Sequence, residues 1–84
     1  MGFSVLQNPV SASLSVSLNL HRGTEVFLRL FSCDGRLVGS FNRGSMQKGL
    51  HTLQLDVSSC ASGLYILSCT AGEESASAVV SVIR

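Results

Sequence analysis

The chain contains the side chains that a hydrolase would use, but their placement does not favour an active site. Hydrolysis by a nucleophilic mechanism needs a nucleophile, a general base and an orienting acid held together. Serines and cysteines could act as nucleophiles, and the acid and base candidates are His21, His51, Asp34 and Asp56. All but His51 fall where turn and strand-end chemistry already explains them, and no Gly-x-Ser-x-Gly elbow occurs. We therefore expect a non-catalytic protein, with His51 as a hydrogen-bonded, partly buried structural residue.

The cysteines do not predict a metal centre or a disulfide framework. Cys33, Cys60 and Cys69 are odd in number and widely spaced, and neither histidine lies near a cysteine in a zinc-like spacing. We expect them to behave as small buried hydrophobes, with Cys69 on the same strand face as Tyr65 and Leu67. A Cys33–Cys60 or a Cys60–Cys69 pair is the alternative. We also expect no cofactor and no small-molecule substrate, because the chain lacks a Gly-rich phosphate loop and has no Trp for a sugar-binding platform.

Length and charge limit the remaining classes of function. A chain of 84 residues has room for one domain, 1–84, and its net charge of +1 with scattered arginines gives no support for nucleic-acid binding. No apolar run approaches the roughly 18 residues of a membrane span. The first residues show no secretory signal peptide. If the domain works outside the cell, we expect it to be the C-terminal part of a larger secreted protein.

Period-two alternation predicts about seven short strands and no helix. The clearest alternation places Ala12, Leu14, Val16, Leu18 and Leu20 on one face. The expected strands are 3–6, 12–20, 25–31, a strand from 37 that ends at 42–45, two runs within 49–67 joined by a Ser/Gly loop, and 75–84. This is the pattern of an all-β protein, an immunoglobulin-like antiparallel β-sandwich.

Turn residues and outer-face residues add further expectations. We expect 21–24 to form a hairpin, and Cys33-Asp34-Gly35-Arg36 to form a turn in which the Asp side chain bonds the backbone and Gly takes a positive φ. Phe27 and Phe31 are expected on the face opposite the core, where either a partner or an adjacent loop covers them.

Several segments, in this order, resemble one known family. They are Asn8-Pro9-Val10, Asp34-Gly35-Arg36-Leu37-Val38, Gly49-Leu50-His51-Thr52-Leu53, Ser62-Gly63-Leu64-Tyr65 and the Val-rich end at Val82-Ile83-Arg84. Together they are similar to the C-terminal sorting domain of type IX secretion cargo (Por secretion system), which is an immunoglobulin-like domain of Bacteroidetes-type bacteria. The chain differs from that family at 73–77, where it lacks the Lys that commonly precedes the final Val run.

The resemblance implies a secretion signal and not an enzyme. The implied partners are an N-terminal cargo domain in cis, the type IX outer-membrane translocon, and a sortase-like peptidase that cleaves the domain and attaches the cargo to the surface. The implied location is the periplasm in transit, then the cell surface or the extracellular space. The resemblance implies that the translocon recognises the last strand, through Val79, Val80, Val82, Ile83 and Arg84. It also implies that a set of motif residues has a structural role, namely Asn8, Pro9, Asp34, Gly35, Gly49, Gly63 and Tyr65.

The alternative function is that of a structural or adhesive spacer. A fibronectin-like or other immunoglobulin-like module of an extracellular protein would show the same strand pattern, because many functions share this sandwich.

Overall fold

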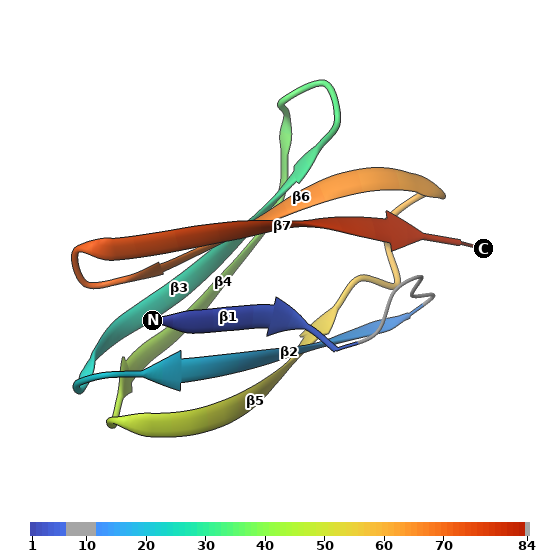
Figure 1. Ribbon diagram of the computed structural model, residues 1–84. Coiled ribbons are helices and arrows are strands. Elements are labelled where there is room, and N and C mark those ends of the chain that lie inside the picture. Colours follow the sequence, from blue (N-terminus) through green and yellow to red (C-terminus); the bar gives the residue numbers. More distant parts are fainter. Residues whose placement is uncertain (7–11, 84) are drawn as a thin grey trace.

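The computed structural model describes residues 1–6 and 12–83. The chain is all-β, as predicted, and the described residues form seven strands and no helix (Figure 1). No helix in this part of the chain is long and apolar enough to cross a membrane. The strands are β1 (Gly2–Val5), β2 (Ser13–Leu20), β3 (Thr24–Ser32), β4 (Leu37–Met46), β5 (Gly49–Asp56), β6 (Gly63–Ala71) and β7 (Glu74–Val82).

The strands form two antiparallel sheets that face each other as a sandwich. One sheet has the order β1-β2-β5 and the other the order β4-β3-β6-β7. A constant-type immunoglobulin domain also has seven strands, but there the fourth strand pairs with the fifth. Here β4 pairs with β3 instead, so the fourth strand belongs to the sheet of β3, β6 and β7 and not to the sheet of β1, β2 and β5. Figure 1 shows β1 running beside β7 of the opposite sheet, with which it is in contact.

The alternating side chains of the two sheets meet in one apolar core. In the three-stranded sheet Val16 pairs with Leu53, and in the four-stranded sheet Leu28 pairs with Cys69. All four side chains are buried, because inward positions recur every second residue along each strand. Tyr65, 8% exposed, also belongs to this core. The alternation read from the sequence therefore assigned the inner faces correctly.

The segment 21–24 does not form the hairpin that we expected. β2 pairs with β1 and β5, whereas β3 pairs with β4 and β6, so residues 21–23 carry the chain from one sheet to the other. A Gly-containing turn between two alternating runs fits either geometry, because alternation reports which face is buried and not which strand is the neighbour. The hairpin prediction was wrong for this reason.

Several strand boundaries also differ from expectation. β7 spans Glu74–Val82 and so ends earlier than the expected 75–84, and the ends of β4 and β2 differ for reasons that the structure shows. β4 continues to Met46 because its register with β3 shifts between Val26 and Phe27, which leaves Arg43 as an additional residue beside Gly44. Such a bulge bends a strand without ending it. Ala12 is exposed and precedes the start of β2, so it is not a core residue.

Candidate functional site

Two of the residues considered for hydrolysis, His51 and Asp56, interact with nearby backbone groups. His51 is half-buried, and its Nε2 lies 2.7 Å from the carbonyl oxygen of Gln47, which agrees with the structural role expected for it. An Asp56 carboxylate oxygen accepts a 2.9 Å hydrogen bond from the backbone N–H of Ser58. His21 is exposed in the connection between the two sheets. Across the described residues, no group of three His, Cys, Asp or Glu side chains is placed to hold a metal ion.

The Asp34–Gly35 turn has the geometry expected for it. The Asp34 carboxylate accepts hydrogen bonds from the Ser32 hydroxyl and from the backbone N–H of Arg36. The Ser32 bond, and next the Arg36 bond, hold the pKa of the Asp34 carboxyl below its usual value, because both favour the charged form. Gly35 has a φ of 88°, which residues with a Cβ rarely adopt. The turn thus closes the β3–β4 hairpin.

The predicted structural role of Tyr65 has a specific form that the sequence analysis missed. The Tyr65 hydroxyl donates a 2.6 Å hydrogen bond to the carbonyl oxygen of Ala61, four residues earlier. This is the tyrosine corner of immunoglobulin-like sandwiches, in which a tyrosine near the start of the sixth strand fixes the crossing between sheets. The sequence feature that could have predicted this hydrogen bond is a Tyr placed shortly after the Ser/Gly loop. Gly63 (φ 156°) begins the same strand, and Gly49 (φ 129°) begins β5.

The cysteines separate into three environments. Cys69 is fully buried beside the Tyr65 and Leu67 positions, as expected, and burial raises the pKa of its thiol. Cys60 is half-buried and packs against the core. Cys33 is exposed, contrary to expectation, because it lies in the turn after β3 ends. Neither of the two disulfide pairings considered is formed.

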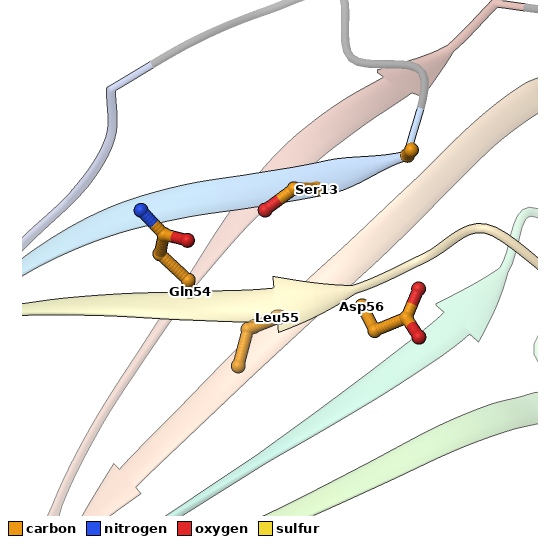
Figure 2. Close-up of a pocket in the computed structure, with 5 residues that line it drawn as sticks. Ser13, Gln54, Leu55 and Asp56 are labelled. Carbon is orange, nitrogen blue, oxygen red and sulfur yellow. The ribbon is translucent and has the colours of Figure 1, made fainter.

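A shallow pocket lies at the ends of β2 and β5 (Figure 2). Its volume is about 370 Å³, and it is lined by Ala12, Ser13, Gln54, Leu55 and Asp56. The Asp56 carboxylate already caps the following turn, and Leu55 belongs to the core. Ser13 and Gln54 are the other polar residues that line it.

The last strand, β7, comes last in the order of the four-stranded sheet, where β6 is the described strand that it pairs with; β1 of the other sheet also contacts it. Val80 and Val82 are buried, at 0% and 1% exposure, and anchor β7 to the core. Val79 and Ile83 are 59% and 55% exposed. Of the residues predicted for recognition, Arg84 lies outside the described residues, as do the motif residues Asn8 and Pro9.

The outer face of this sheet carries aromatic residues, as expected. Phe27 and Phe31 are half-buried, and the guanidinium carbon of Arg29 lies 4.8 Å from the centre of the Phe27 ring. The stacked Arg29 shields Phe27 in part. Leu64 and Ile66, which were not expected from the sequence, share this face because β6 alternates around its buried residues.

Comparison with known families agrees with the motifs and the fold. Residues 4–83 match the model of a family described as secretion system C-terminal sorting domain. No curated protein and no solved structure matches the chain significantly. Because the family match extends over almost all of the chain, and the fold is the expected two-sheet β-sandwich, the chain belongs to the type IX secretion C-terminal sorting domains.

Proposed function

We propose that residues 1–84 form a single, non-catalytic address domain that brings an N-terminal cargo through the periplasm to the type IX outer-membrane translocon. Membership of the family supports the general part of this function, which is a secretion signal that leads to the cell surface or the extracellular space. Domains of this kind interact with the secretion machinery and are generally not enzymes.

The exposed side chains near the end of β7 are the observation that carries the proposal. We propose that the translocon recognises Val79, Val80, Val82 and Ile83, at the end of β7, together with Arg84, which follows them in the sequence. Large apolar side chains exposed on a strand are candidates for contact with a partner. The exposed Val79 and Ile83 side chains are accessible in the folded domain, whereas the buried valines keep the strand in place.

The other motif residues support this role indirectly. Asp34 and Gly35 form a turn, Gly49 and Gly63 begin strands, and Tyr65 fixes the crossing that leads into β6. Because β6 is the strand on which β7 lies, we propose that these residues present the terminal strand. Asn8 and Pro9 are proposed to belong to the same scaffold.

The arrangement of β1 and β7 supports recognition and cleavage at different ends of the domain. The backbone nitrogen of Met1 lies 3.0 Å from a carboxylate oxygen of Glu74, at the start of β7, and Figure 1 places the end of β7 at the opposite end of the sandwich. We propose that a sortase-like peptidase cleaves before the domain and attaches the cargo to the surface. Cleavage there is compatible with recognition of residues 79–84 by the translocon at the other end.

A delivery assay tests the proposed recognition. A reporter carrying a periplasmic export signal is fused in front of the chain, in a bacterium with a type IX system, and reporter on intact cells is measured against reporter in the periplasm. We expect deletion of 79–84 to retain the reporter in the periplasm. The variant Val79→Thr/Ile83→Thr should reduce delivery while leaving the core valines in place, whereas Leu50→Thr on the other sheet should not.

One outcome would contradict the proposal, and another would require further variants. Delivery that survives both the deletion and the double substitution would show that the terminal strand is not recognised, and would favour the spacer function. A melting temperature of Val79→Thr/Ile83→Thr far below that of the unchanged chain would mean that the substitutions act through unfolding. In that case Val79→Thr and Ile83→Thr would be tested singly, and a loss of surface delivery without a loss of stability would support recognition of the strand.

A further inference from the structure

Four exposed apolar residues and the half-buried Phe31 form a continuous patch across the outer face of the four-stranded sheet. The strand register places Leu37 of β4 opposite Phe31 of β3, Phe31 opposite Ile66 of β6, and Ile66 opposite Val79 of β7. Leu64 extends the row by one position along β6 on the same face. We call these five residues the outer stripe. With adjacent strands spaced about 4.8 Å apart, the row across four strands is about 14 Å long.

The outer stripe contrasts with the rest of its face. Leu37, Leu64, Ile66 and Val79 are 51%, 56%, 43% and 59% exposed. The next row consists of polar residues, Ser40, Arg29, Ser68 and Ser77. An outward face of a sandwich strand is ordinarily polar, so a row of exposed large hydrophobic side chains on it indicates an interaction site.

The size of the outer stripe favours a transient partner over a second copy of the chain. Half of the surface of five such side chains amounts to on the order of 400 Å², within the range of the largest apolar patch of a typical monomer. A stable interface buries about 800 Å² on each partner. An area of this size suits an encounter that must later be released, as a secretion signal requires.

The position of the outer stripe disfavours the cargo domain as its occupant. The cargo precedes Met1, which lies at the start of β7 beside Glu74. Val79 is five residues further along the strand, which corresponds to about 17 Å. The stripe also faces away from the three-stranded sheet into which the N-terminal residues lead. A partner in trans can therefore reach it while the cargo is attached.

We propose that the outer stripe is a docking surface for a component of the secretion machinery that presents an apolar, uncharged ridge. This inference rests on the proposed function and deepens it. The machinery reads the folded face of the sheet, through β3, β4 and β6, in addition to the terminal strand. No charged side chain lies within the stripe, and the one charge in the next row is Arg29, so an apolar ridge matches the stripe itself better than a charged one.

The delivery assay tests the outer stripe without altering the terminal strand. The variant Leu37→Thr/Ile66→Thr leaves residues 79–84 unchanged, and Thr keeps a strong preference for strands. The matched control is Leu50→Thr, since Leu50 is 73% exposed on the outer face of the other sheet. We expect at least about tenfold less reporter on the surface for the stripe variant, the effect of losing about 1.4 kcal/mol of binding free energy. The control should deliver normally.

Stability and oligomeric state complete the experiment. The melting temperature of the stripe variant should stay within a few degrees of that of the unchanged chain, because exposed substitutions change stability by about 0.5 kcal/mol or less. If the melting temperature falls further, the single variants Leu37→Thr and Leu64→Thr are measured in the same delivery assay, and reduced delivery by a variant of normal stability supports the docking surface.

Three results would overturn the inference. Normal delivery by the stripe variant, while deletion of 79–84 abolishes delivery, would show that the outer stripe is not a docking surface. The proposed function would still hold. An equal loss with Leu50→Thr would show a general effect of exposed apolar residues. A dimer in sedimentation analysis that disappears in the stripe variant, with delivery unchanged, would assign the surface to a second copy of the chain.

Discussion

Replacement of Tyr65 tests whether the tyrosine corner holds the sandwich together. Tyr65→Phe keeps the ring but removes the 2.6 Å hydrogen bond to the Ala61 carbonyl. Ala61 is exposed, so water can satisfy its carbonyl oxygen, and we expect a cost of about 1 kcal/mol. Tyr65→Ala also removes a ring that is only 8% exposed, which we expect to cost about 3–5 kcal/mol.

These costs are large for a domain of this size. A stability of 0.05–0.15 kcal/mol per residue gives roughly 4–13 kcal/mol for 84 residues. One kcal/mol lowers the melting temperature of such a domain by about 4–8 °C. We therefore expect Tyr65→Phe to melt several degrees lower, and Tyr65→Ala to be partly unfolded at 37 °C if the stability lies near the lower limit.

Urea and thermal unfolding followed by far-ultraviolet circular dichroism measure both variants. Leu64→Ala is the control, because it truncates a neighbour on the same strand that is 56% exposed, and we expect a change of about 0.5 kcal/mol or less. The reasoning is refuted if Tyr65→Phe melts with the unchanged chain and Tyr65→Ala costs less than about 1 kcal/mol. That result would mean that neither the ring nor its hydroxyl supports the crossing between the sheets.

Three further predictions concern the β3–β4 turn and the thiols. Ser32→Ala should raise the pKa of the Asp34 carboxyl towards its usual value, as an NMR titration would show; because folding lowers that pKa, its stabilising effect is present above about pH 4 and is lost as the pH falls. Gly35→Ala should cost about 1 kcal/mol in urea unfolding, since φ is 88° and no neighbour lies within 4 Å of the added Cβ. Cys33 should react with a thiol reagent in the folded protein, whereas Cys69 should react only on unfolding, and equal rates would contradict the burial of Cys69.

Much of the local structure could be predicted because its causes are local. The Asp34–Gly35 turn follows from a carboxylate that bonds nearby N–H groups and a residue that tolerates a positive φ. The buried positions of β2, β3 and β6 follow from period-two alternation, which any strand with one apolar face must show. The burial of Tyr65 in the core followed from the same rule, but the hydrogen bond from its hydroxyl to the Ala61 carbonyl could not be predicted in this way.

The sequence by itself determined the strands, their inner faces and, through its ordered motifs, the family. Only the tertiary structure decided which strands are neighbours, and it made residues 21–23 a crossing between sheets where a hairpin was expected. It also brought Leu37, Ile66 and Val79 into one exposed row, although they are far apart in the chain. The physical reason is that alternation fixes which way each side chain points, whereas the register between distant strands depends on how both sheets pack over the shared core.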